Sequence, residues 1–269
     1  MKVSATCPAY VTGMFSIEGN DAAGAGFAID KRLTTSVSAG KGRTTIMINS
    51  KECAAPVSKA VMQKYSEING KLGVIEIKHS TIIPIGCGLG MSAAGAVSLS
   101  LCLNEFLGCG LKFADCVKIA HDSEVLCGTG LSGADAAAIG GILARKTVND
   151  APVKLPFEER EFEFAFFAPI KTASITREES WKKRVNAACK NAMDELFEER
   201  TLDGLVLSSR RFAKESGLAG WCEKEMDGNP RASMTMVGET LFSDAPMRLS
   251  RKPFALMKAK TYEGGAGIE

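Results

Sequence analysis

Twelve residues, Pro84–Gly95 (PIGCGLGMSAAG), constrain the fold of this 269-residue chain more than any other stretch. They contain four glycines, three of them at alternate positions, and the sequence that follows predicts a helix over Ser92–Leu107, ended by Gly108. A tight turn before a buried helix needs only one glycine. Alternate glycines let several backbone N–H groups point into one concavity, and the helix start adds its dipole and unpaired N–H groups. The stretch therefore predicts a phosphate-binding loop, with a simple tight turn as the alternative.

The loop lacks the lysine of other nucleotide-binding loops. It contains neither Gly-Lys-Ser/Thr nor G-x-G-x-x-G. Metal and backbone must then carry more of the phosphate charge. Ser92, at the helix start, offers a hydroxyl that could cap the helix or bind a cation held by phosphates. We predict phosphate contacts from Gly86, Cys87, Gly88, Leu89, Gly90, Met91, Ser92 and Ala93.

Composition excludes several classes of partner. The chain is 45% hydrophobic and 24% charged, with a net charge of +2 and no basic run of five residues, so we expect no nucleic-acid partner. No apolar run reaches the length of a membrane span, and the N-terminal residues lack the apolar segment of a signal peptide. We therefore expect a cytoplasmic protein with no membrane contact.

Cysteine and histidine counts argue against metal chemistry based on these residues. Nine cysteines occur without any C-x-x-C, so neither a disulfide framework nor a zinc site is indicated. Reduced, mostly buried thiols that pack as small apolar groups are the expectation. The two histidines, His79 and His121, exclude a multi-histidine metal site.

Strands and helices are distributed as in an α+β protein with two lobes. Composition shifts at 149–160, where two prolines and dense charge occur, so we place the division there, with lobes of 1–150 and 151–269. Thr176 and Glu179 form a predicted capping box that starts a helix to about Glu199. Short strands are predicted at 2–6, 10–17, 26–29, 33–38, 44–48, 73–80, 161–169, 233–243 and 254–262, and further helices at 54–68, 112–127, 201–216 and 218–226.

The glycine stretch resembles the phosphate loop of the GHMP kinases, the family that includes the galactose, homoserine and mevalonate kinases. The resemblance implies a two-lobed GHMP kinase fold, ATP as phosphoryl donor and Mg²⁺ as its metal. It also makes a homodimer the mild expectation, and it suggests adenine contacts within 44–65. The matching residues are Pro84, Gly88, Leu89, Gly90, Ser92, Ala93 and Ala94; Met91 stands where a second serine is common.

Two carboxylates downstream match roles in that family. Glu124 in HDSEVLCG lies where the resemblance implies a Mg²⁺ ligand beside Ser92, although a helical glutamate is by itself more often solvated. Asp135 in TGLSGADAAAIGG takes the place of the aspartate that serves as base in mevalonate kinases. An aspartate here could accept the proton of the acceptor hydroxyl, or could simply favour the start of a helix.

The N-terminal strand most resembles that of the archaeal pantoate kinases, a group within this family. The implied activity is ATP-dependent phosphorylation of a hydroxyl of pantoate, giving 4-phosphopantoate for coenzyme A biosynthesis. The residues that match are Pro8, Thr12, Gly13, Phe15, Gly24, Ala25 and Gly26, together with the pattern of Ser233–Phe242 (SMTMVGETLF). The resemblance makes Thr12, Phe15, Ser16, Gly24, Ala25 and Gly26 candidate substrate contacts; an ordinary edge-strand pattern is the alternative.

Departures from the pantoate kinase pattern leave alternatives open. Tyr10 replaces a histidine, and Ala22 and Ala23 replace polar residues. The pattern Gly-Leu-Gly-Asp becomes Gly-Leu-Ser-Gly, with Asp135 two residues later. A mevalonate-type hydroxy acid, or a GHMP-fold protein that binds nucleotide without turnover, are therefore the alternatives. The substrate carboxylate needs a cation, for which Arg32, Lys171 and Arg177 are candidates.

Overall fold

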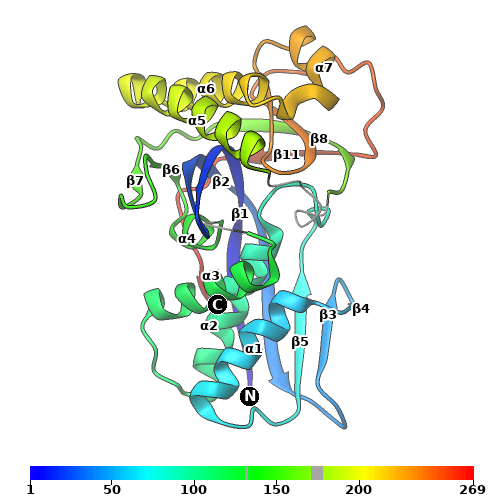
Figure 1. Cartoon of the computed structure of the whole chain (residues 1–269). Helices are drawn as coiled ribbons and strands as arrows, with labels where there is room; N and C mark the ends of the chain where they lie inside the picture. Colours follow the sequence, from blue (N-terminus) through cyan, green and yellow to red (C-terminus); the bar gives the residue numbers. More distant parts are fainter. Residues whose placement is uncertain (131–132, 171–177) are drawn as a thin grey trace.

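Two β-sheets and the helices packed on them form the molecule. The structure is a computed structural model that describes residues 1–130, 133–170 and 178–269. The first sheet has the order β12-β1-β2-β5-β3-β4, with β6 joined to β2 and β7 to β6; the second has the order β11-β8-β10-β9. Helices α1–α4 lie beside the first sheet, whereas α5, α6 and α7 lie at the other end of the molecule, where α5 packs on α6 and β1, and α6 also contacts β9 of the second sheet (Figure 1).

The elements have the following bounds. In the first sheet they are β1 (Lys2–Glu18), β2 (Asp21–Ala39), β3 (Thr45–Ile48), β4 (Lys51–Glu52), β5 (Ile75–Ser80), β6 (Ile142–Arg145), β7 (Val153–Lys154) and β12 (Gly267–Ile268), and in the second β8 (Glu161–Ala168), β9 (Ala232–Met234), β10 (Glu239–Ser243) and β11 (Ala255–Lys260). The helices are α1 (Pro56–Asn69), α2 (Met91–Leu107), α3 (Phe113–Cys127), α4 (Gly133–Ile139), α5 (Glu179–Glu199), α6 (Leu202–Glu215), the 3₁₀ turn η2 (Leu218–Trp221) and α7 (Glu223–Gly228).

The first two strands form one long antiparallel hairpin, not the four short strands expected. β1 has 17 residues and β2 has 19, paired along almost their whole length with two register shifts. The glycines taken as breaks instead let the strands approach closely. A Cβ on Gly24 would lie 2.2 Å from the Met14 carbonyl oxygen, and one on Gly26 would lie 2.2 Å from that of Val11.

Most predicted helices are confirmed with small shifts, but the helix predicted over 218–226 is instead the 3₁₀ turn η2 followed by the short helix α7. α1, α2, α3 and α6 begin and end within two residues of their predicted bounds. α5 begins at Glu179 with Glu178 as its N-cap, and Thr176 lies outside the described residues. The stretch predicted as one strand over 233–243 is a hairpin of β9 and β10, because Val237 and Gly238 turn the chain.

An aromatic cluster joins the two sheets. Phe27 on β2 stacks on Phe162 of β8 with ring centroids 4.7 Å apart, and Phe242 of β10 meets both rings edge-on at 5.7 and 5.9 Å. All three side chains are buried. β7 and β12, from the second half of the chain, also pair in the first sheet. The two sheets therefore share one core, and the division into lobes at residue 150 stays a prediction.

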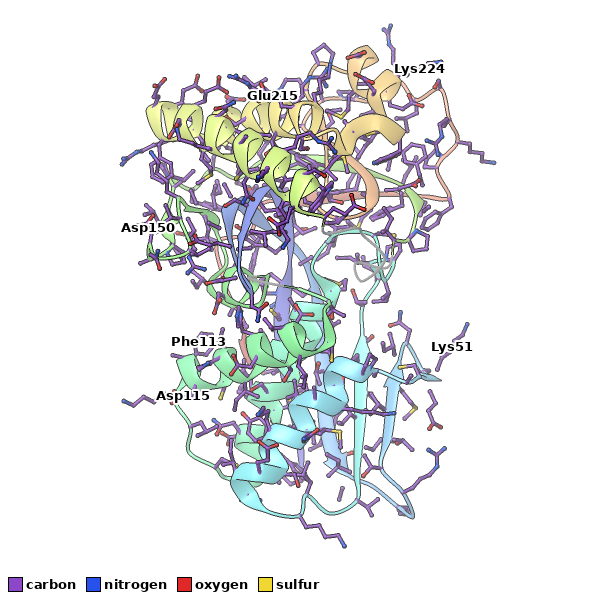
Figure 2. All side chains as sticks on the ribbon, in the orientation of Figure 1. Lys51, Phe113, Asp115, Asp150, Glu215 and Lys224 are labelled. Atoms are coloured by element: carbon purple, nitrogen blue, oxygen red, sulfur yellow. The ribbon has the colours of Figure 1, made fainter. Side chains whose placement is uncertain are left out.

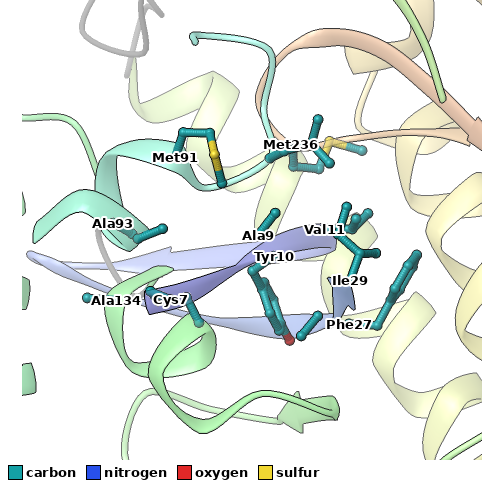
Figure 3. Close-up of a cluster of buried hydrophobic side chains, with 14 of the residues drawn as sticks. Cys7, Ala9, Tyr10, Val11, Phe27, Ile29, Met91, Ala93, Ala134 and Met236 are labelled. Atoms are coloured by element: carbon teal, nitrogen blue, oxygen red, sulfur yellow. The ribbon is translucent and has the colours of Figure 1, made fainter. Parts of the chain in front are cut away.

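A second part of the core surrounds β1. Figure 3 shows Ala9 and Val11 of β1 in one cluster with Met91, the first residue of α2, and Met236 of the β9–β10 turn. Residues from three distant parts of the chain thus meet over the hairpin, and the phosphate-loop helix is anchored on it.

Charged side chains lie mostly on the outside, as Figure 2 shows for Lys51, Asp115, Asp150, Glu215 and Lys224. Among the described residues, no helix combines the length and apolarity required to cross a lipid bilayer.

We predict that Phe242→Ala lowers the free energy of unfolding by about 3–5 kcal/mol, because it opens a cavity in the cluster that holds the sheets together. Phe113→Ala is the matched control, since Phe113 is 47% exposed and its truncation should change stability by no more than ~0.5 kcal/mol. Urea unfolding of both variants measures this; equal losses would contradict the role given to the cluster.

Candidate active site

Two cavities share part of their lining. One has a volume of about 620 Å³ and is lined by the glycine loop, the start of α2, Glu124 and part of α1. The other, about 440 Å³, is lined by the far half of the β1–β2 hairpin and by α3 and α4. Thr12, Phe15, Ala22 and Gly133 line both. The larger cavity suits a nucleotide and the smaller suits an organic acid. A group could pass from one ligand to the other where the two cavities share these residues.

The carbonyl groups of the glycine loop are held from outside. The Gly86 carbonyl accepts from the Ile170 N–H at 2.8 Å, and the Leu89 carbonyl accepts from the Tyr10 N–H at 3.2 Å. No described residue accepts a hydrogen bond from the N–H groups of residues 86–90. These amides border the larger cavity together with the first turn of α2, which is the arrangement expected of the anion-binding cradle that the sequence predicts.

Each glycine of the loop has a left-handed backbone. The φ angles are 83° at Gly86, 78° at Gly88 and 67° at Gly90, a region that other residues rarely adopt. At Gly88 there is also no space, because a Cβ would lie 2.5 Å from the Thr235 Oγ1 and 2.9 Å from the Gly238 amide nitrogen. Backbone conformation therefore favours glycine at all three positions, and lack of space requires it at Gly88.

The β9–β10 turn clamps the loop from the second sheet. Thr235 and Thr240 both donate hydroxyl hydrogen bonds to the Cys87 carbonyl, at 3.1 and 2.9 Å. Gly238 lies against the same peptide, where a Cβ would come 2.4 Å from the Cys87 carbonyl carbon. The stretch Ser233–Phe242 thus has a structural function that its sequence did not reveal, namely to hold the phosphate loop in shape.

Glu124 is the buried carboxylate of the site. It lies on α3, is 3% exposed, and accepts from the Thr129 hydroxyl at 2.9 Å. Burial raises the pKa of Glu124, while hydrogen bonds from Ser92 and Thr129 act in the opposite direction without cancelling it. Gly130 leaves room for the carboxylate, since a Cβ there would lie 2.5 Å from Glu124 Oε2. The solvated-helix alternative is therefore wrong for this residue.

The donor set at the start of α2 fits a magnesium ion. Ser92 is exposed toward the larger cavity and is hydrogen-bonded to Glu124, so a hydroxyl and a carboxylate converge beside the loop amides. Mg²⁺ prefers such hard oxygen ligands together with phosphate oxygens and water. Because Glu124 is buried without a cationic partner among its hydrogen bonds, a bound cation would compensate its charge.

Most of the predicted substrate contacts line the smaller cavity. Thr12, Phe15, Gly24 and Ala25 do so. Ser16 and Gly26 border neither cavity. Ser16 is hydrogen-bonded toward the Cys189 thiol of α5. Gly26 lies against β1, as described above.

The cations of the smaller cavity are not those expected. Arg32 stacks on the Tyr262 ring at 5.6 Å and lines neither cavity, and Lys171 and Arg177 lie outside the described residues. The cavity is instead lined by His121 and Lys118 of α3 and by Arg145 at the end of β6. A period-two strand pattern does not show that β6 ends beside the hairpin, so these cations could be found only from the fold.

Asp135 faces the smaller cavity from the first turn of α4, and its carboxylate lies 3.5 Å from the His121 Nδ1. The hydrogen bond that protonated His121 donates to the Asp135 carboxylate raises the pKa of His121, against the effect of partial burial. Gly133, one of the residues shared by both cavities, has room for a side chain among the described residues, where a Cβ would meet only the Ala93 Cβ, at 3.5 Å. Asp135 thus lines the smaller cavity alone and is not among the residues, such as Gly133, that line both cavities.

A fold of this topology with a glycine loop, a buried glutamate and an acceptor cavity defines the GHMP kinase class. Residues 53–145 match the model of the "GHMP kinases N terminal domain". The solved structure of a "Phosphotransferase related to CoA biosynthesis pathway" superposes over 100% of this chain and 99% of that chain, with a TM-score of 0.81 at 21% identity. The α+β GHMP kinase fold predicted from sequence is confirmed.

Two relatives show which group of GHMP kinases this chain resembles over most of its length. The pantoate kinase of Methanocaldococcus jannaschii is 30% identical over 250 residues, covering 87% of this chain and 90% of the relative. That of Methanospirillum hungatei JF-1 is 26% identical over 264 residues, covering 90% and 87%. The chain belongs to the pantoate kinase family.

We predict that the double variant Thr235→Val, Thr240→Val raises the KM for ATP about tenfold or more, because the Cys87 carbonyl loses both donors and is left buried and unpaired. The KM for the acceptor should change little, since neither threonine lines the smaller cavity. Steady-state kinetics with each substrate varied in turn measures both. An equal effect on the two KM values would contradict a clamp specific to the phosphate loop.

We predict that Glu124→Gln abolishes Mg²⁺-dependent turnover yet stabilises the nucleotide-free protein. A raised folded-state pKa means that the carboxylate costs stability as pH rises through that pKa, so the gain should appear at neutral pH and disappear near pH 4. Melting curves at both pH values, with a rise of roughly 1–4 °C expected at neutral pH, measure this. Glu105→Gln, on the partly exposed side of α2, is the control and should show no such pH-dependent gain.

Proposed function

We propose that this protein is an ATP-dependent pantoate kinase that transfers the γ-phosphoryl group to the primary hydroxyl of pantoate, giving 4-phosphopantoate for coenzyme A synthesis in the cytoplasm. One observation carries the proposal: the phosphate cradle and a cation-lined acceptor cavity meet at Thr12 and Gly133. The named relatives support pantoate as the acceptor. A homodimer stays a prediction.

The smaller cavity has the chemistry that pantoate requires. Pantoate combines a carboxylate, two hydroxyls and two methyl groups on one carbon. Met14, Phe15 and Leu143 supply apolar walls for the methyl groups. His121, whose pKa is raised by its hydrogen bond to Asp135, is the candidate cation for the carboxylate, with Lys118 also lining the cavity.

Arg145 shapes the cavity in another way. Its guanidinium binds both carboxylate oxygens of Asp21 at 3.1 Å and also donates to the backbone carbonyls of Ala22, Val148 and Asp150. All five of its N–H donors are thereby engaged within the protein. We therefore assign the substrate carboxylate to His121, and assign Arg145 to fixing the hairpin end that carries Asp21.

In the mechanism, the chain contributes positioning, charge and a proton acceptor. Loop amides of residues 86–90 and the start of α2 bind the phosphates and stabilise the charge that develops during transfer. Ser92 and Glu124 would hold Mg²⁺, which neutralises phosphate charge when bound. Asp135 accepts the proton of the acceptor hydroxyl, and its hydrogen bond to His121 orients the carboxylate.

The position of Asp135 favours one alternative that must be tested. Gly133 occupies the junction where the pantoate kinase pattern has its aspartate, so a protein that binds nucleotide without turnover is the second candidate. The intact pair of Ser92 and Glu124 favours turnover.

The deciding experiment measures ADP release with Mg-ATP and pantoate, mevalonate, homoserine, shikimate or no acceptor. We expect release with pantoate and a loss of kcat of about 10²-fold or more in Asp135→Asn, the size of a general-base contribution. Release with another acceptor would keep the mechanism and change the substrate. ATP binding without release from any acceptor would favour the non-catalytic protein.

A transplanted aspartate tests the base directly. Gly133→Asp in the Asp135→Asn background places a carboxylate at the junction, where a Cβ fits. Partial recovery of kcat is expected if the lost function is proton acceptance. No recovery, together with an unchanged kcat in Asp135→Asn alone, would make Asp135 a helix-start residue.

A further inference from the structure

The smaller cavity is lined by one buried hydroxyl-bearing side chain that the mechanism above leaves unused. Tyr10 of β1 is 5% exposed and lines this cavity but not the larger one. Its hydroxyl makes no hydrogen bond to any described residue. The other buried tyrosine, Tyr65 on α1, differs, because its hydroxyl donates to the Ser100 carbonyl at 2.8 Å. A buried hydroxyl is costly to leave unpaired, so Tyr10 is suited to receive a partner from a ligand in the cavity.

The fold makes room for the Tyr10 ring on this side of β1. Figure 3 shows Ala9 and Val11 on the side of the strand that faces Met91. The Tyr10 ring extends to the opposite side, as the alternation of side chains along a strand requires. A Cβ on Gly26 of the paired strand would lie 2.7 Å from Tyr10 Cε1. Gly26, which borders neither cavity, therefore serves the smaller cavity by leaving space for the ring.

Position and charge leave one group of pantoate for Tyr10. The primary hydroxyl must reach the phosphate, so it belongs where both cavities share Thr12 and Gly133. The carboxylate requires a cation, for which His121 and Lys118 are the candidates. Burial raises the pKa of the Tyr10 phenol further above neutrality, so the group is uncharged and can both donate and accept a hydrogen bond. The phenol therefore matches the secondary hydroxyl of pantoate, which is also neutral and also donates and accepts.

We propose that the Tyr10 hydroxyl hydrogen-bonds the secondary hydroxyl of the acceptor, the one that is not phosphorylated, and that Tyr10 thereby determines specificity for 2-hydroxy acids. The proposal rests on the proposed function, since it takes pantoate as the acceptor. A site built around a substrate hydroxyl rejects an analogue that lacks it, because the buried partner is then left unpaired. The contact also distinguishes the two enantiomers of pantoate: with the carboxylate and the primary hydroxyl held, exchanging hydrogen and hydroxyl on the intervening carbon takes the hydroxyl away from Tyr10.

The test removes the hydrogen bond from either side. The acceptors are pantoate and 4-hydroxy-3,3-dimethylbutanoate, which lacks only the secondary hydroxyl, and the enzymes are the wild type and Tyr10→Phe, which lacks only the phenol oxygen. We expect kcat/KM for the acceptor to fall about tenfold or more when either group is removed, and no more than about twofold further when both are removed. The KM for ATP should stay unchanged, since Tyr10 does not line the larger cavity. The preference of the wild type for one enantiomer of pantoate should shrink by about the same factor in Tyr10→Phe.

The stability of the free protein gives a readout that does not depend on turnover. Because the Tyr10 hydroxyl has no hydrogen-bond partner among the described residues, Tyr10→Phe should melt at the wild-type temperature or slightly above it. Tyr65→Phe is the matched control, since it removes a buried hydroxyl that donates to the Ser100 carbonyl. Its melting temperature should fall by roughly 2–6 °C.

Two results would overturn the proposal. One is an effect of Tyr10→Phe on kcat/KM that is absent, or that is equal for pantoate and the deoxy analogue, because Tyr10 would then only shape the cavity. The other is a fall in the melting temperature of Tyr10→Phe as large as that of Tyr65→Phe, because the hydroxyl would then have a partner within the protein. If the wild type phosphorylated pantoate and either result were found, this proposal would fail and the proposed function would stand. If the wild type bound ATP but did not phosphorylate pantoate, both would fail.

Discussion

The Cys87 carbonyl is the contact on which the site depends. It accepts from two threonine hydroxyls of the second sheet, while its own peptide lies in the phosphate loop that follows the first sheet. Turning this carbonyl outward, together with those of Gly86 and Leu89, leaves the loop N–H groups facing the cavity. Such a cradle binds an anion without reorganising, because the hydrogen bonds that shape it already exist before binding. The phosphate site is thus built by both halves of the chain.

The loop and the helix could be predicted from the sequence because each depends on local chemistry. Alternate glycines favour left-handed backbone, and Gly86, Gly88 and Gly90 all have it. The helix after them was predicted to within one residue at its start. Glu124 was indicated only by the resemblance to the GHMP kinases, and it lines the same cavity as Ser92.

What could not be predicted depends on contacts between distant residues. The glycines of β2 suggested strand breaks, yet they permit the close pairing of two long strands, which only the partner strand reveals. The acceptor cavity takes His121 from α3 and Arg145 from β6, and no sequence spacing indicates that these elements meet at the hairpin. Thr235 and Thr240 resembled a family pattern, but their function became clear only with Cys87 beside them.

Burial separates the polar groups of the site by function. Glu124 is 3% exposed, and burial disfavours the charged form of its carboxylate. A bound cation would compensate that charge, so the carboxylate that destabilises the cation-free protein would favour cation binding. His79, at 4% exposure, is kept neutral, so only one of its two ring nitrogens carries a proton. His121, partly exposed beside Asp135, is instead favoured in its charged form. The two histidines of this chain therefore differ in their preferred charge, and the difference follows from burial and from whether a carboxylate lies beside the ring.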